Sequence, residues 1–185
     1  MAKRPDPNWS AHELVDSTLL SNNVHYLSGD VDDVSIAPVI KWILHENLIK
    51  KADTLTLYIN SYGGDMYEAL ALIDVMKASE IPVHTIGIGS VMSAAFFIFI
   101  SGNHRTIGQR ATAMCHQYAS SVEGKHHDLK ASIEEGDRLN HEMISLIGTA
   151  SELNIRTIKS NLLKETDVYL TAQDMLDLGL ADTIY

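Results

Sequence analysis

The sequence is poor in cysteine, in positive charge and in long apolar runs. Cys115 is the only cysteine among 185 residues, so no internal disulfide can form and a reducing compartment is expected. The 14 Lys and Arg residues are outnumbered by 24 Asp and Glu residues, which gives a formal net charge of −10. Binding to nucleic acid needs clustered Lys and Arg that neutralise phosphates, so this charge balance indicates no nucleic-acid partner.

No segment has the apolar length of a membrane span. The run AAFFIFI at 94–100 falls far short of the roughly 20 apolar residues that a spanning helix requires. The N-terminal stretch MAKRPDPNWS begins basic but has no apolar region behind it, so it does not fit a secretory signal. A chain of this length suits one domain. We therefore expect a single cytoplasmic domain over residues 1–185, with no membrane partner.

Short β-branched segments alternate with helical patterns along the chain. Strands are expected at 24–31, 54–60, 81–89, 110–117 and 167–170. Helices are expected at 35–51, 64–79, from Ser93 onward, and at 126–151, 155–164 and 171–179. The last helix has a capping box of Thr171 and Asp174, and Gly179 as its stop signal. Strands that alternate with helices predict an α/β fold with βαβ crossovers and a mainly parallel sheet.

Three of the expected strands end in polar or glycine residues. These ends are NSYGGD at 60–65, GSVMSA at 89–94 and CHQYASS at 115–121. Each could be an ordinary loop, but parallel sheets place their chemistry at the carboxyl ends of the strands. We therefore expect the three segments to lie on the same edge of the sheet.

Gly63 and Gly64 stand between a strand and a helix. Backbone N–H groups at such a place attract negative charge, either a phosphate or a transient oxyanion. The glycine patterns of dinucleotide and P-loop sites are absent, which disfavours phosphate. A tight turn that needs positive φ angles is the structural alternative.

Ser93 opens an apolar helix, at a strand-to-helix turn that can expose a nucleophile. Ser is also a common helix cap, so a purely structural role is the alternative. A serine hydroxyl needs a nearby base, and His116, at the end of an apolar strand, is the candidate, although it could equally be a structural histidine. Asp167 could orient the imidazole; its rivals are Asp174, Asp177 and Asp182.

Four segments together resemble one known family. LYINSYGGD, MSAAF, MCHQ and DVYLTAQDMLDLGLAD resemble the proteolytic subunits of the Clp protease, the ClpP family, in the same order and at close to the same spacing. The resemblance covers nearly the whole chain from Ser17 onward. It implies a crotonase-like fold of repeated strand–helix units with a projecting helical handle at about 126–151.

The resemblance also implies an activity and its residues. The expected protein is a serine endopeptidase without cofactor or metal, which cleaves peptides or unfolded polypeptides inside two stacked seven-membered rings. Ser93 falls on the family's nucleophile, His116 on its general base and Asp167 on its orienting carboxylate. The backbone N–H groups of Gly64 and Ala94 fall on its oxyanion hole.

The chain departs from the family at several positions near the site. Tyr62 and Tyr118 replace prolines, and Ala94 and Ala95 stand where Met and Gly are common. The glycine-rich segment that usually follows the histidine and lines the substrate groove is here ASSVEGKHHD, with one glycine. The family's peptide preference therefore does not carry over.

Other departures concern partners. Tyr58 remains of two tyrosines that line the family's docking pocket for AAA+ unfoldases, but Thr56 stands at the other position. About sixteen residues precede Ser17, too few for the family's axial hairpin. We therefore expect an unfoldase to dock weakly. Mixed rings with another ClpP-type subunit would supply intact docking pockets. We also expect the polar helix at 126–151 to lie outside the core, with Leu129, Ile133, Leu139 and Ile144 near subunit contacts.

Three other functions fit the sequence less well than a peptidase. An inactive ring subunit with a scaffold role would usually have lost a member of the triad, and all three are present. A crotonase-type acyl-CoA enzyme would not need a Ser–His–Asp set. A metal site is disfavoured because the nine histidines are scattered, and His126 and His127 fit a solvated helix face.

Overall fold

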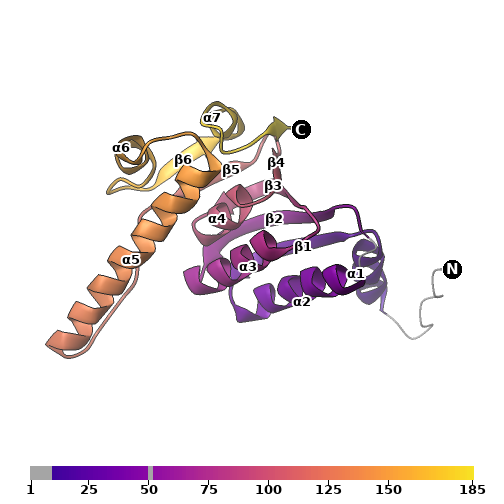
Figure 1. Ribbon diagram of the computed structural model, residues 1–185, viewed down its shortest axis with the longest axis horizontal. Helices are drawn as coiled ribbons and strands as arrows, with labels where there is room; N and C mark the ends of the chain where they lie inside the picture. Colours follow the sequence, from indigo (N-terminus) through magenta and orange to yellow (C-terminus); the bar gives the residue numbers. More distant parts are fainter. Residues whose placement is uncertain (1–9, 50–51) are drawn as a thin grey trace.

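The fold is built on one seven-stranded sheet, seen in a computed structural model that describes residues 10–49 and 52–185 (Figure 1). Five strands pair in parallel in the order β1 (Val24–Val31), β2 (Leu55–Gly64), β3 (Val83–Met92), β4 (His104–Ile107) and β7 (Thr183–Ile184). The carboxyl end of β3 also pairs in parallel with β5 (Thr112–Cys115), and β6 (Val168–Thr171) pairs antiparallel with β5. The expected α/β class and mainly parallel sheet are confirmed.

Helices cover one face of this sheet. Helices α2 (Asp33–Ile49), α3 (Met66–Ala78) and α4 (Ala94–Ile100) lie against it, and every residue of α4 is buried (Figure 1). In β2 the residues alternate, with Leu55, Leu57 and Ile59 buried and the residues between them partly exposed. This alternation follows from the strand period of two, since one face of the sheet packs on helices and the other stays open in the single chain.

Several elements differ from the expectation in detail. Helix α1 (Ala11–Ser21), capped by Ser10, and strands β4 and β7 were not expected. The expected helix at 155–164 is a short α6 (Ile155–Thr157) followed by a π-helix, η1 (Ile158–Leu162). Residues 1–9 of the expected N-terminal segment and residues 50–51 of the helix expected at 35–51 lie outside the described residues. Helix α7 (Ala172–Asp177) has the predicted capping box, and Gly179 follows with φ +69°.

The long helix α5 (His126–Ala150) has two different halves. Its first half projects away from the sheet (Figure 1), and Leu129 and Ile133 are exposed there. Its second half packs on the sheet domain through Leu139, Met143 and Ile147, all buried. The expectation that the whole helix lies outside the core, with Leu139 at a subunit contact, is therefore wrong, because Leu139 is a core residue. Within residues 10–49 and 52–185, no helix is both long and apolar enough to cross a membrane.

Candidate active site

Ser93 lies in a strained turn between β3 and α4. Its backbone has φ 53° and ψ −126°, a conformation that non-glycine residues rarely adopt and that clusters at functional sites. The backbone N–H of Ser93 donates to the carbonyl of Met114 at 2.8 Å, which holds the turn against β5. The hydroxyl makes no capping hydrogen bond to α4. The helix-cap interpretation of Ser93 is therefore wrong.

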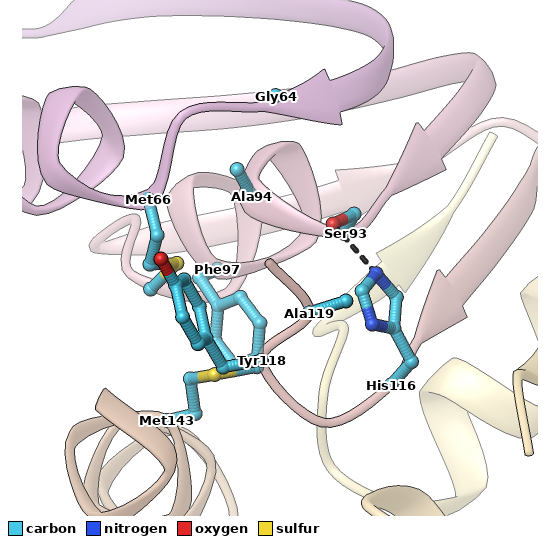
Figure 2. Close-up of a pocket in the computed structure, with 9 residues that line it drawn as sticks. All are labelled: Gly64, Met66, Ser93, Ala94, Phe97, His116, Tyr118, Ala119 and Met143. Atoms are coloured by element: carbon cyan, nitrogen blue, oxygen red, sulfur yellow. Dashed lines mark hydrogen bonds between the residues drawn. The ribbon is translucent and has the colours of Figure 1, made fainter. Parts of the chain in front are cut away.

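His116 reaches the Ser93 hydroxyl from the neighbouring strand. Because Met92 of β3 stands in register with Met114 of β5, the residues that follow the two strands meet at one edge of the sheet. The distance from His116 Nε2 to Ser93 Oγ is 2.8 Å (Figure 2). His116 Nδ1 lies within hydrogen-bond distance of the Gln117 carbonyl oxygen. A carbonyl can only accept, so Nδ1 carries the proton and Nε2 is free to accept from the serine hydroxyl.

Asp167 forms no hydrogen bond or ion pair with His116. It is exposed, directly before β6, and the acceptor at Nδ1 is the Gln117 carbonyl instead. The Gln117 side chain donates to the Leu163 carbonyl at 2.8 Å, which ties the end of β5 to the segment that carries Asp167. The role of Gln117 is not visible in the sequence, because a backbone carbonyl has no sequence signal.

The three rival carboxylates are engaged elsewhere. Asp174 caps α7 by accepting from the backbone N–H and hydroxyl of Thr171, Asp177 accepts from Gln173 at 2.7 Å, and Asp182 forms a 2.6 Å ion pair with Arg105. Each of these three carboxylates therefore already has a partner other than His116.

The glycine pair lets β2 approach both Ser93 and β1. A Cβ at Gly63, which has φ +102°, would lie 2.6 Å from Ser93 Cβ and 3.0 Å from the Ala94 nitrogen. A Cβ at Gly64 would lie 2.3 Å from the Val31 carbonyl oxygen. Neither contact is tolerable for a side chain, so the glycines serve a close backbone approach as well as a turn. Gly64 and Ala94 line the same hollow as Ser93 and His116.

The hollow beside Ser93 has a volume of about 290 Å³ including its open mouth. Beyond the residues already described, its walls are largely apolar side chains from α3, α4, α5 and the segment after His116: Met66, Phe97, Met143, Tyr118 and Ala119 (Figure 2). Such a surface suits an uncharged side chain. The two methionines and Phe97 are not distinguishable as site residues in the sequence, since buried apolar residues look alike until the fold shows which of them face an opening.

Cys115 does not compete with Ser93 as a nucleophile. Burial raises the pKa of its thiol to about 12, and its Sγ donates to the Leu162 carbonyl at 3.2 Å. At neutral pH it is a protonated thiol, whereas the thiolate is the reactive form. Over the described part of the chain, no three His, Cys, Asp or Glu side chains are grouped so that they could hold a metal ion, and His126 and His127 are exposed.

Tyr58 lies near the start of β2, whereas the site lies at the carboxyl end of this strand. It pairs with Tyr26 of β1 and Ile86 of β3, and it is partly exposed on the open face of the sheet. Thr56, two residues earlier, lies on the same face.

Comparisons with known proteins agree with this architecture. The sequence model of the Clp protease family matches residues 10–185. The chain is 29% identical over 170 residues to an "ATP-dependent Clp protease proteolytic subunit" of Borrelia garinii subsp. bavariensis, across 91% of this chain and 87% of that protein. It is 29% identical, with the same coverage, to "ATP-dependent Clp protease proteolytic subunit 1" of Borreliella burgdorferi. A Bacteroides thetaiotaomicron proteolytic subunit is 24% identical, across 91% of this chain and 76% of that protein.

Proposed function

Since the chain belongs to the Clp protease family, we propose that it is a serine endopeptidase that cleaves short peptides or unfolded polypeptides as the proteolytic subunit of a Clp-type protease. The observation that carries the proposal is the 2.8 Å contact between Ser93 Oγ and an imidazole nitrogen that is free to accept a proton. A serine without such a base is inert at its ordinary pKa. We propose a single domain over residues 1–185 and a cytoplasmic location.

The reaction follows from these positions. Ser93 Oγ attacks the scissile carbonyl carbon while His116 Nε2 takes the hydroxyl proton. The carbonyl oxygen becomes an oxyanion that accepts hydrogen bonds from the backbone N–H groups of Gly64 and Ala94. When the tetrahedral intermediate collapses, His116 gives its proton to the leaving amine. A water molecule, activated by His116 in turn, then hydrolyses the acyl-enzyme and regenerates Ser93.

Labelling of the serine separates a peptidase from a scaffold subunit. We expect an active-site serine phosphonate to add one adduct to the intact protein, located on Ser93 by peptide mapping, because the Ser93–His116 pair activates this hydroxyl alone. The buried neutral thiol of Cys115 gives no competing product. A protein that stays unlabelled at saturating reagent would favour the alternative function, an inactive ring subunit with a scaffold or regulatory role in mixed Clp complexes.

Asp167 is proposed as the orienting carboxylate, with a supporting role. We expect Asp167→Asn to lower kcat by clearly less than the roughly 10⁴-fold that is typical of a triad aspartate, since the Gln117 carbonyl already accepts from His116 Nδ1. The measurement is kcat for a fluorogenic peptide. A full 10⁴-fold loss would contradict the role of the carbonyl and would mean that the segment before β6 moves toward His116 in the assembled enzyme.

We propose that the projecting half of α5 takes part in the assembly of rings. Ile133 is 66% exposed on the projecting half of α5, where Leu129 is also exposed, and such side chains gain from burial against a second subunit. We expect the protein to sediment as a ring or double ring, and Ile133→Asp to shift it toward smaller species. A wild-type monomer at micromolar concentration in sedimentation velocity would contradict the proposal.

Partner docking is proposed on the open face of the sheet. Tyr58 supplies one aromatic contact for an AAA+ unfoldase, whereas Thr56 cannot supply the second. Interfaces draw most of their energy from a few buried anchors, so rings of this chain alone would engage an unfoldase weakly. Mixed rings with another ClpP-type subunit would restore the missing anchors.

A further inference from the structure

The hollow beside Ser93 is placed to receive one side chain of the substrate. Ser93 and His116 lie on one side of it, and Met66, Tyr118 and Met143 lie on the other (Figure 2), so the carbonyl under attack sits on the Ser93 side. The side chain that enters is that of the residue contributing this carbonyl, which we call the acyl-side residue. Among the residues that the structure describes, no Asp, Glu, Lys or Arg lines the hollow, and a charged side chain would lose its hydration there without a partner.

Tyr118 forms a fixed wall of this hollow. Its backbone N–H donates to Asn140 Oδ1 of α5 at 2.8 Å. Its ring lies along the same helix, where a methyl group at Gly136 would be 3.5 Å from Tyr118 Cδ1. Figure 2 shows the ring in the hollow, with its hydroxyl end toward Met66. Only Gln117 separates His116 from Tyr118 in the sequence. The position of the proposed general base and the position of the Tyr118 ring therefore depend on the same short segment.

The other side chains that line the hollow differ in flexibility. Met66 and Met143 have flexible, unbranched side chains that adapt to a ligand. Phe97 is fully buried and its ring packs edge-on against Phe96, with centroids 5.3 Å apart. The rigid limits of the hollow are therefore the two aromatic rings of Phe97 and Tyr118. Of these, only Tyr118 is partly exposed, so it stands between the hollow and the solvent.

We infer that Tyr118 is the specificity-determining residue of this site, and that it restricts the acyl-side residue to medium-sized aliphatic side chains such as Leu and Met. The inference rests on the proposed peptidase function. The cavity volume of about 40 Å³ is far below the roughly 300–1,000 Å³ of typical small-molecule pockets, so it leaves room for no more than one medium-sized side chain. A Phe or Trp ring would have to occupy the space that the Tyr118 ring fills.

The test uses the assembled full-length protein and peptides that differ only in the acyl-side residue: Ala, Leu, Met, Phe, Trp and Lys. For the wild type we expect the highest kcat/KM with Leu and Met. We expect values lower by about tenfold or more with Phe and Trp, in line with the 10–200-fold effect of one methylene group in an apolar pocket. Tyr118→Leu is expected to raise the Phe-to-Leu and Trp-to-Leu ratios by about tenfold, and Tyr118→Phe to keep the wild-type ratios.

Tyr169→Ala is the matched control, because this tyrosine is 62% exposed on β6 and does not line the hollow. The kcat/KM ratios of this variant should equal those of the wild type.

Inhibition of the wild type by peptide aldehydes with Leu or Trp at the same position gives a second measurement that does not depend on the folding of a variant. A wild type that prefers Phe or Trp, or a Tyr118→Leu variant with unchanged ratios, would overturn the inference while labelling of Ser93 still supported the peptidase. A wild type that neither cleaves any peptide nor reacts at Ser93 would instead overturn the proposed function and this inference with it.

Discussion

Replacement of Ser93 with alanine is expected to abolish peptide hydrolysis and to leave the fold intact. Loss of the nucleophile from a Ser–His–Asp set typically costs about 10⁴–10⁶ in kcat. The fold should survive because the hydroxyl caps no helix and its hydrogen bond is to His116. The turn itself is held by the backbone N–H of Ser93, which alanine retains. The measurements are kcat for a fluorogenic peptide and the thermal unfolding midpoint of the variant.

Ser90→Ala is the matched control for this experiment. Ser90 lies three residues earlier in β3. The backbone N–H of Ser90, and not its side chain, donates to Asn60 Oδ1. Turnover should therefore stay at the wild-type level. Hydrolysis by Ser93→Ala at a rate near that of the wild type would rule out the proposed mechanism.

Replacement of Gly63 with alanine is expected to have the second-largest effect. The added methyl group would lie 2.6 Å from Ser93 Cβ and 2.7 Å from the Met92 carbonyl oxygen, so the end of β2 and the Ser93 turn must move apart. That movement takes the Gly64 N–H away from the position of the oxyanion, and loss of one such donor costs about 10²–10³ in kcat. The φ of +102° adds backbone strain of about 1–3 kcal/mol for a non-glycine residue.

Gly148→Ala separates this contact from a general effect of removing a glycine. Gly148 lies within α5, and a methyl group there would be 3.7 Å from Ile158 Cδ1, an ordinary contact. We expect unchanged kcat and a free energy of unfolding higher by about 0.5–1 kcal/mol, because alanine is the better helix former. If Gly63→Ala lowered stability but kept the full kcat, the close approach of β2 would serve the fold alone.

Local patterns along the chain predict several features of the fold and of the site. Runs of β-branched and apolar residues predict the strands at 24–31 and 54–60, close to β1 and β2, because such side chains pack well on a pleated sheet. Ser93 and His116 were identified from their places at strand ends, and a parallel sheet brings such ends to one edge. Their 2.8 Å contact needed only that these strands pair in the expected direction.

Other features depend on residues that are distant in the sequence, and only the folded chain shows them. The pattern of α5 does not show that Leu139 is buried while Ile133 is exposed, since only the position of the sheet determines where the helix leaves the core. Strand β4 has one buried residue and forms because β3 and β7 offer hydrogen-bonding edges on both sides. The acceptor for His116 Nδ1 was predicted to be a carboxylate, and in the structure it is the carbonyl of Gln117. Every residue carries a carbonyl, and only the path of the backbone after β5 decides which one the imidazole meets.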